Sequence, residues 1–254
     1  MTETADFITV AEHGPERRIA VRVREGRGPA VVWLGGFRSD MTATKATALD
    51  EWAAGAGRRF VRFDYAAHGA SSGRFEDYTI SAWLADAQAV IAAHAGDRPV
   101  LVGSSMGGWI ACLAARTMAA QGKPASGLVL IAPALDFTED LLWAKLTEAQ
   151  RQAMEAAGHV RVPSEYDARP NVLTMALVED GRRRLMLGGP VTLGCPVHIL
   201  QGGRDPDVPH THADRLLERL PDEGTVLTFI ADGDHRLSRP QDIARLVGAV
   251  ADMT

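Results

Sequence analysis

The chain is poor in cysteine and in positive charge, and both shortages narrow its possible functions. Its 254 residues include two cysteines, Cys112 and Cys195, which lack the spacing of a metal-binding motif. We expect both to be buried free thiols in a reducing compartment. Lys and Arg number 27 against 32 Asp and Glu, which gives a net charge of −5. This balance argues against a nucleic-acid partner and against binding to anionic lipid by charge alone.

Long apolar segments are also missing from the sequence. No run approaches the length that crosses a bilayer, so no integral membrane segment is expected. The start, Met1 to Asp6, is acidic and has no apolar region of the signal-peptide type. These absences predict a cytoplasmic protein. At 46 % hydrophobic residues, the chain suits one globular domain over residues 1–254 with a substantial core.

What the sequence does contain is an alternation of short β-rich runs and longer alanine-rich runs. The predicted strands cover residues 6–10, 18–23, 30–34, 59–64, 99–103, 127–131, 195–201 and 225–230. The predicted helices cover residues 41–57, 80–95, 106–121, 211–220 and 239–251. After an opening antiparallel pair, this order indicates an α/β fold: a mostly parallel eight-stranded sheet with helices on both faces. Reactive residues are expected at the carboxyl ends of its strands.

The most informative motif is Gly103-Ser104-Ser105-Met106-Gly107, which fits the pattern G-x-S-x-G. It follows an apolar run and precedes a predicted helix, as the nucleophile elbow of a serine hydrolase requires. Glycine is needed at positions 103 and 107 because side chains there would collide with the helix that packs back on the strand. Only Ser105 has glycines two residues away on both sides. Ser105, and not Ser104, is therefore the predicted nucleophile.

A serine hydroxyl needs a base to take its proton, and the base needs a carboxylate that fixes its tautomer. His235 directly follows the last predicted strand and is the predicted base. Asp205 comes first after the preceding strand and its glycine turn, and it is the predicted acid. Asp207 stays open as the alternative acid. Asp234 is expected to be a turn residue, because neighbours in sequence rarely face each other.

The other histidines are predicted to have structural or solvent-exposed positions. His198 lies within a predicted strand and should be packed or hydrogen-bonded, and His94 ends a predicted helix. His68, in a glycine-rich loop, is expected to be exposed or to border the pocket. We expect three more histidines to be solvated: His13, His210 and His212. No pair of histidines has metal-ligand spacing with carboxylates or cysteines, so neither a metal nor another cofactor is predicted.

The oxyanion hole needs two backbone N–H donors placed where negative charge develops. Met106 follows the nucleophile at the start of a helix and is one predicted donor. The second should come from the loop after strand 30–34, where Gly35 and Gly36 let the backbone turn. This makes the N–H of Phe37 the best second donor, and its ring is then a candidate pocket wall.

Residues 134–190 interrupt the strand–helix alternation and are predicted to form a small helical lid inserted between two strands. Thr147 to Gln150 fits a capping box at the start of a helix. Around it runs an apolar stripe at helical spacing: Leu141, Leu142, Trp143, Leu146 and Met154. Two interpretations of the stripe stay open. It packs within the lid, or it faces the serine and receives an acyl chain.

With these residues placed, the chain resembles the α/β-hydrolase superfamily, and within it the acyl-protein thioesterase (depalmitoylase) and mycophenolic acid acyl-glucuronide esterase group. The matching segments span nearly the whole domain: 36–37, 62–65, 69–76, 102–109, 162–166, Asp205 with 208–209, and 234–236. The resemblance implies that Ser105, Asp205 and His235 are nucleophile, acid and base, and that Asp64 stabilises a turn. One departure is Gly35, which stands where many superfamily members have histidine. The animal members of the group are mitochondrial, whereas no mitochondrial presequence precedes this domain, which suggests a bacterial cytoplasmic relative.

The sequence therefore predicts a serine esterase or thioesterase that cleaves a small-molecule or acylated substrate through an acyl-enzyme. An aspartate nucleophile, as in dehalogenases and epoxide hydrolases, is excluded by Ser105. Acyl transfer to an acceptor other than water uses the same triad and stays open as an alternative. A non-catalytic ligand-binding protein is the other alternative, although such proteins typically lose a triad member. The sequence does not indicate an oligomeric state.

Overall fold

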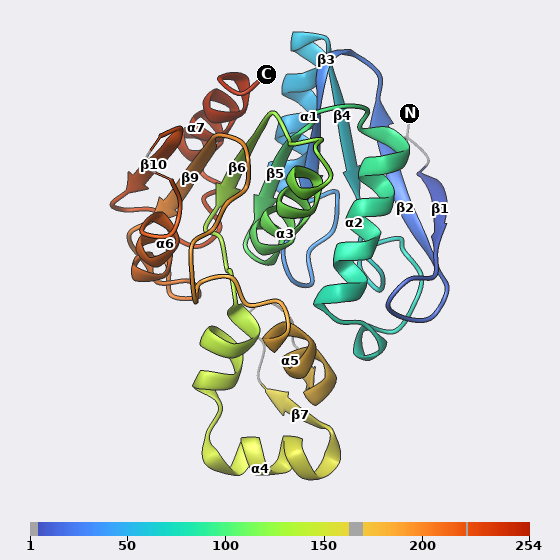
Figure 1. Cartoon of the computed structure of the whole chain (residues 1–254), viewed down its shortest axis with the longest axis vertical. Coiled ribbons are helices and arrows are strands. Elements are labelled where there is room, and N and C mark those ends of the chain that lie inside the picture. The colour runs from blue at the N-terminus through green and yellow to red at the C-terminus, as the bar shows by residue number, and fades with distance from the viewer. Residues whose placement is uncertain (1–4, 163–169, 222) are drawn as a thin grey trace.

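An eight-stranded sheet forms the centre of the computed structural model, which describes residues 5–162, 170–221 and 223–254 (Figure 1). Its strands are β1 (Asp6–Val10), β2 (Arg17–Arg24), β3 (Arg27–Leu34), β4 (Arg58–Phe63), β5 (Val100–Ser104), β6 (Gly127–Ile131), β9 (Val197–Gly202) and β10 (Thr225–Ile230). They lie in the order β1-β2-β4-β3-β5-β6-β9-β10. β2 is antiparallel to β1 and to β4, and the strands from β4 to β10 in that order are parallel. The predicted sheet is confirmed.

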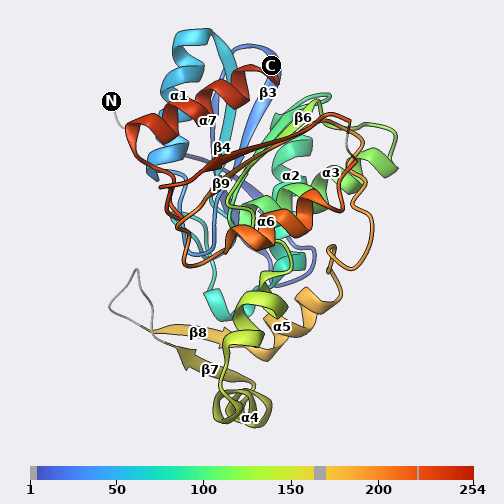
Figure 2. The same ribbon diagram turned by 90° about the vertical axis from the view of Figure 1, so that its left-hand side faces the viewer.

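Helices cover both faces of the sheet, as Figure 2 shows from the side. They are α1 (Thr44–Ala56), α2 (Ile80–His94), α3 (Met106–Ala120), α6 (His210–Leu217) and α7 (Pro240–Ala251), and a short 3₁₀ turn lies at Phe75–Asp77. Side chains of β3 alternate between the faces: Val31 and Trp33 pack with α1 and α7, whereas Val32 and Leu34 pack with α2 and α3. Strands buried on both sides in this way are nearly continuous in apolar residues.

An insertion (residues 134–190) follows β6. Its described residues, 134–162 and 170–190, project beyond the carboxyl ends of the strands (Figures 1 and 2). Its elements are a π-helical turn (Thr138–Leu142), a 3₁₀ turn (Trp143–Lys145), α4 (Glu148–Ala157), β7 (His159–Val162), β8 (Asn171–Thr174) and α5 (Met175–Arg182). β7 and β8 pair antiparallel, which adds a hairpin to the predicted helices. The Pro163–Tyr166 part of the family resemblance lies outside the described residues.

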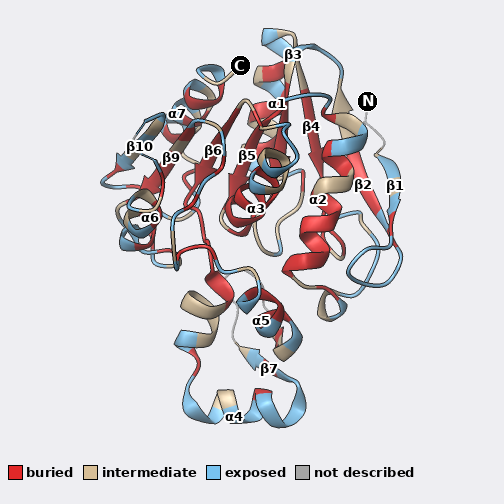
Figure 3. Ribbon diagram, viewed as in Figure 1, coloured by how far each residue is buried: buried red, intermediate tan, exposed pale blue. Residues whose placement is uncertain are grey.

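The insertion has a small core of its own, although much of α4 is exposed (Figure 3). Five buried side chains form this core: Leu146, Met154, Val160, Leu173 and Val178. The predicted capping box of α4 is confirmed, because Gln150 N donates to Thr147 Oγ1 and Thr147 N donates to Gln150 Oε1. A capping box satisfies two backbone donors that the helix itself leaves without acceptors.

Two buried carboxylates fix the insertion, one within it and one to the rest of the chain. Asp136 is 3 % exposed and accepts hydrogen bonds from the backbone N–H groups of Met186 and Leu187, which joins the two ends of the insertion. Asp180 in α5 accepts from both the backbone N–H and the hydroxyl of Ser81, at 2.7 and 2.8 Å. The Asp180 contacts fix the insertion to the start of α2.

The prediction that His212 is solvated is wrong, because its side chain is 5 % exposed. His68 is 3 % exposed, which excludes the exposed alternative for that residue. His212 lies on the inner face of α6, where Nε2 bonds the carbonyl of Leu135 at 2.6 Å. His198 is hydrogen-bonded to Thr228 Oγ1, as its position in a strand predicts.

Both cysteines are free, Cys112 buried and Cys195 partly buried. Among the described residues, no helix combines the length and apolar character that a membrane span requires.

Candidate active site

Ser105 lies in the sharp turn between β5 and α3. Its φ of 55° and ψ of −120° place it in a region that residues other than glycine rarely adopt. Its backbone N–H donates to Ile131 O at 2.9 Å, and its carbonyl accepts from Gly108 N at 2.9 Å. These bonds hold the strained turn, which presents the partly exposed Ser105 side chain at the carboxyl end of the sheet.

The two glycines of the motif are required by close backbone contacts. A Cβ atom on Gly107 would lie 2.1 Å from the carbonyl oxygen of Leu34, and one on Gly103 would lie 2.3 Å from the carbonyl oxygen of Gly107. Neither contact is possible for a side chain without movement of the backbone. The crowding between helix and strand that the motif predicts is therefore present.

The structure brings the three predicted triad side chains into one chain of hydrogen bonds. His235 Nε2 lies 3.2 Å from Ser105 Oγ, and His235 Nδ1 lies 2.8 Å from Asp205 Oδ2. The Asp205 side chain is fully buried and that of His235 is 17 % exposed. An imidazole with a buried carboxylate on Nδ1 carries its proton there and leaves Nε2 free to accept from the serine.

Backbone groups orient the Asp205 carboxylate. Its Oδ1 accepts from the N–H groups of Asp207 and Val208, at 2.9 and 2.8 Å, and its Oδ2 faces His235. The side-chain amide of Gln201, which is 1 % exposed, donates to the carbonyl of Val208 and lies 3.5 Å from Asp205 Oδ2. These contacts fix the direction of the carboxylate.

Asp207, the alternative acid, also lies close to this site. Ligand atoms of Asp205, Asp207 and His235 lie within 4.8 Å of one another, and in the described part of the chain they form the group spaced for a metal ion. His235, however, uses Nδ1 toward Asp205 and Nε2 toward Ser105. The imidazole therefore has no lone pair to give to a metal in this arrangement, and the geometry fits proton transfer better.

The two predicted oxyanion donors border the nucleophile. Met106 is the first residue of α3, and Phe37 lies in the β3–α1 loop (residues 35–43). A Cβ atom on Gly36 would lie 3.4 Å from Ser105 Cβ, so this loop passes directly against the nucleophile. Within the described residues, neither the Phe37 N–H nor the Met106 N–H has a protein acceptor. Both donors are thus available to a ligand.

The β3–α1 loop is held by side chains from the segment after β4. Asp64 accepts from the N–H of Met41 at 2.7 Å and from that of Ala70 at 2.8 Å, which confirms its turn-stabilising role. His68 Nε2 lies 3.1 Å from the backbone N of Arg38, and Nδ1 lies 2.9 Å from Ala66 O. Burial lowers the pKa of His68 to about 4. The hydrogen bond to Ala66 acts to raise this pKa, and the nearby Arg38 charge acts to lower it further.

Apolar side chains pack around Phe37 and along the predicted acyl-binding stripe. The Phe37 ring meets the edges or faces of Phe75 and Phe137, at centroid distances of 5.0 and 5.6 Å. Of the predicted acyl-binding residues, Leu141, Leu142 and Trp143 are partly exposed, with Leu142 packed between the main core and the insertion core.

Leu146, 8 % exposed, belongs to the insertion core. Its position agrees with the packing interpretation of the apolar stripe. Contact with an acyl chain stays a prediction for the stripe as a whole.

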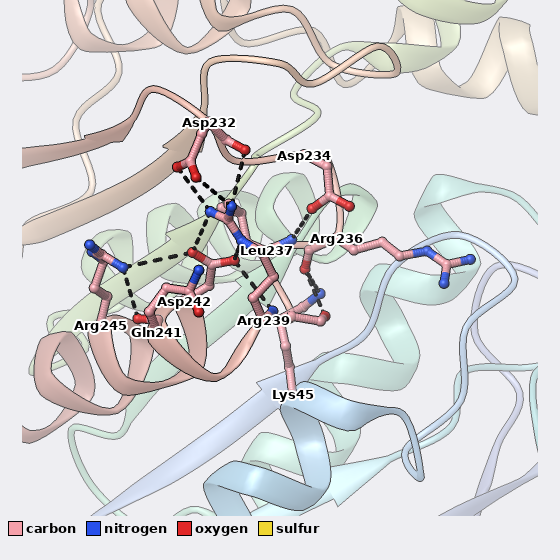
Figure 4. A network of polar contacts seen from close by, with 10 residues as sticks. Lys45, Asp232, Asp234, Arg236, Leu237, Arg239, Gln241, Asp242 and Arg245 are labelled. Carbon is pink, nitrogen blue, oxygen red and sulfur yellow. Dashed lines mark hydrogen bonds and ion pairs between the residues drawn. The ribbon is translucent and has the colours of Figure 1, made fainter.

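The loop that carries His235 (residues 231–239, the β10–α7 loop) is closed by charged side chains (Figure 4). Arg239 bonds Asp232 at one end of the loop and Asp242 in α7. The Asp234 carboxylate accepts from the N–H of Leu237 at 3.0 Å, as expected of a turn residue. Lys45 Nζ donates to the carbonyl of Arg236 at 2.5 Å.

Three residues with positions important to the site were not predicted: His68, Lys45 and Gln201. Each contacts the backbone of a loop that carries a site residue. Lys45 and Arg236 are 191 positions apart, and His68 and Arg38 are 30 apart. No local motif marks such a contact. Gln201, a polar residue at the end of an apolar strand beside the predicted acid, is the one with a local signal.

Comparison with known proteins agrees with this geometry. The model of the alpha/beta hydrolase family matches residues 30–246, which is most of the chain. The chain belongs to the α/β-hydrolase family. It is 29 % identical over 236 residues to the mouse (Mus musculus) protein named palmitoyl-protein thioesterase ABHD10, mitochondrial, covering 92 % of this chain and 78 % of that one. The human protein of that name is 28 % identical over 237 residues, with coverages of 92 % and 76 %.

Solved structures show the same relationship. The crystal structure called "Putative hydrolase from Agrobacterium vitis S4" is 48 % identical to this α/β hydrolase, with a TM-score of 0.94 over 98 % of both chains. Mouse ABHD10 is 25 % identical, with a TM-score of 0.86 over 98 % of both chains. The predicted resemblance to α/β hydrolases with thioesterase-like relatives is confirmed. The mouse and human relatives are named as mitochondrial, so the cytoplasmic location stays a prediction.

Proposed function

We propose that this α/β hydrolase is a serine esterase or thioesterase, which cleaves carboxylic ester or thioester bonds through an acyl-enzyme. The observation that carries the proposal is the hydrogen-bonded chain from Ser105 through His235 to Asp205, with spans of 3.2 and 2.8 Å. Hydrolases whose nucleophile is a serine use this arrangement on unrelated folds, so geometry rather than sequence position supports it.

The first step is attack of Ser105 Oγ on the acyl carbonyl carbon. His235 Nε2 accepts the hydroxyl proton as the new C–O bond forms, and Asp205 stabilises the resulting imidazolium. The N–H groups of Phe37 and Met106 donate to the oxyanion. Each such donor contributes about 3 kcal/mol to stabilising the transition state.

The second half of the cycle restores the enzyme. When the tetrahedral intermediate collapses, the bond to the leaving group breaks and His235 gives its proton to the departing alcohol or thiol. His235 then takes a proton from water, the hydroxide adds to the acyl carbon, and Ser105 leaves with that proton. The products are a carboxylic acid and the alcohol or thiol, so no cofactor is consumed.

For the substrate, we propose an acyl chain, with the insertion acting as a lid in a single hydrolase domain over residues 1–254. The relatives named palmitoyl-protein thioesterase support an acylated substrate. Partly exposed apolar side chains in the β3–α1 loop and the insertion support the same class: Phe37, Leu141, Leu142 and Trp143. A cytoplasmic location is proposed on the two free cysteines, which fit a reducing compartment.

The test is hydrolysis of p-nitrophenyl esters and acyl thioesters of increasing chain length by the wild type and by Ser105→Ala. Ser104→Ala is the matched control, because Ser104 lies beside the nucleophile but outside the triad. We expect Ser105→Ala alone to lose activity, and a fluorophosphonate to label every form except that one. Full activity of Ser105→Ala would refute the serine mechanism.

Chain length tests the substrate class separately. A maximum of kcat/KM at medium or long acyl chains supports the acyl-binding role of Leu141, Leu142 and Trp143. Activity confined to acetyl and butyryl esters keeps the triad but rejects that role. Absence of both hydrolysis and labelling would favour the non-catalytic alternative.

A further inference from the structure

The direction of the Phe37 N–H depends on the conformation of the β3–α1 loop. The next residue, Arg38, has a φ of 58°, in the left-handed region that few residues other than glycine adopt. Such a conformation persists only where its surroundings hold it. The turn is closed on one side by Ser39 N, which donates to Gly36 O at 3.1 Å. The other side is held by His68.

His68 is a buried side chain with both ring nitrogens engaged. Its ring is packed among aromatic neighbours, with centroids 5.3 Å from Phe75, 5.4 Å from Trp83 and 5.8 Å from Tyr65. Nδ1 lies 2.9 Å from Ala66 O, and Nε2 lies 3.1 Å from Arg38 N. The aromatic packing leaves the imidazole little freedom to move away from these two partners.

The identity of the partners fixes the protonation state of His68. A carbonyl oxygen can only accept, so Nδ1 carries the proton and donates to Ala66. A backbone N–H can only donate, so Nε2 is unprotonated and accepts from Arg38. In a charged imidazolium Nε2 would also carry a proton, and its N–H would face the N–H of Arg38 with no acceptor between them. Burial, which lowers the pKa of His68 to about 4, favours the same neutral state.

We propose that His68 is a positioning residue for the reaction, because its Nε2 holds the Phe37–Arg38 peptide so that the Phe37 N–H points at the developing oxyanion. The inference rests on the proposed hydrolase function. The Arg38 N–H belongs to the peptide that starts at the Phe37 carbonyl, so its hydrogen bond fixes the plane next to the donor. The Gly36–Phe37 peptide, which carries the donor, is therefore held by the Ser39–Gly36 hydrogen bond at its own carbonyl and by the Arg38–His68 hydrogen bond at the next peptide.

A positioning role and a simple packing role can be told apart by the kinetic constant that each one changes. The Phe37 N–H acts most strongly on the charge of the transition state, so its misdirection lowers kcat more than it raises KM. Removal of an oxyanion donor lowers kcat by about 10² to 10³-fold. A donor that remains but is misaligned should therefore lower kcat by about 10 to 100-fold.

Two variants separate the hydrogen bond from the volume of the side chain. His68→Met fills the aromatic pocket without an acceptor, whereas the longer polar side chain of His68→Gln can place an oxygen where Nε2 lies. We expect His68→Met to lower kcat by about 10 to 100-fold with KM changed by less than about threefold, and His68→Gln to recover most of the loss. Should His68→Met fail to fold, His68→Asn, which is too short to reach Arg38, replaces it.

The experiment measures kcat and KM for the best p-nitrophenyl ester, and the affinity for an alkylboronic acid, which forms a tetrahedral adduct on the serine. The boronic acid affinity of His68→Met should fall in parallel with kcat. Equal kcat in the wild type and His68→Met, or a loss confined to KM, overturns the positioning role while Ser105-dependent hydrolysis stands. Lack of Ser105-dependent hydrolysis in the wild type overturns the proposed function and this inference together.

Discussion

The ammonium group of Lys45 donates a 2.5 Å hydrogen bond to the carbonyl of Arg236, the residue that follows His235 (Figure 4). Lys45 is in the first turn of α1, so this bond joins α1 to the loop that carries the proposed base. Burial lowers the pKa of Lys45 to about 8, although the Asp234 charge opposes the shift. At neutral pH the lysine is therefore still mostly protonated and a strong donor.

Replacement of Lys45 by methionine should lower kcat/KM by about tenfold. The variant keeps most of the length of the side chain but leaves the Arg236 carbonyl without this donor, so the His235 loop loses an anchor. Displacements of about 1 Å at a reacting group lower rates by up to about 100-fold, and a loosened loop should cost less than that. Lys123→Met, at an exposed position, is the matched control. Equal kcat/KM in the two variants would show that the anchor is dispensable.

The closeness of the three predicted triad residues could be predicted from the sequence because of the topology of parallel sheets. Ser105, Asp205 and His235 each follow a strand, and the carboxyl ends of parallel strands meet at one edge. A local pattern therefore implied a spatial contact between residues 130 positions apart. The capped start of α4 was predictable for a similar reason, since a capping box lies within four consecutive residues.

Burial of individual histidines was not predictable in this way. His68 precedes a glycine in a loop, and His212 lies three residues after Pro209 near the start of α6, and both positions are typical of exposed residues. Each is buried because a distant segment covers it: the β3–α1 loop lies over His68, and the chain entering the insertion lies over His212. The hairpin β7–β8 was missed because four-residue strands are too short for a clear period.

Asp205→Asn should separate the predicted acid from its alternative. The variant keeps the shape of the side chain but cannot hold His235 with its proton on Nδ1, so we expect kcat to fall by about 10⁴-fold, as in other triads. Asp207→Asn should change kcat by less than about tenfold, because His235 bonds Asp205. Both are measured with the same p-nitrophenyl ester. A larger loss in Asp207→Asn than in Asp205→Asn would reverse the assignment.

Asp180→Ala should loosen the insertion from the body of the protein. Burial acts to raise the pKa of Asp180, but hydrogen bonds from Ser81, Thr79 and Arg183 outweigh it, so the pKa is lowered. The carboxylate is thus ionised and accepts twice from Ser81. Its removal leaves two buried donors unpaired, which should reduce the free energy of unfolding by about 2 kcal/mol.

Hydrogen exchange of the α5 backbone amides is the direct measurement of this anchoring. It should be faster in Asp180→Ala than in the wild type, whereas Asp97→Ala, at an exposed position, should leave it unchanged. Unchanged exchange in Asp180→Ala would mean that the insertion is held by its apolar contacts instead. Urea unfolding gives the accompanying change in stability.

His68 should also make the stability of the protein depend on pH. Its pKa is lowered by burial to about 4, against about 6.5 in the unfolded chain. Between these values the unfolded chain binds a proton that the folded chain does not, so the free energy of unfolding rises with pH. The stabilisation is complete above about pH 6.5 and is lost as the pH falls toward 4.

Comparison of the wild type with His68→Gln isolates this contribution, because the other titrating groups are common to both proteins. A shift of this size corresponds to about 3 kcal/mol, so the stability advantage of the wild type should shrink by up to that amount between pH 7 and pH 4. Urea unfolding at several pH values measures it, with His13→Gln, at an exposed position, as the control. A wild-type advantage that stays constant over this range would mean that the folded and unfolded chains protonate His68 at the same pH. The burial of His68 would then not favour its neutral state.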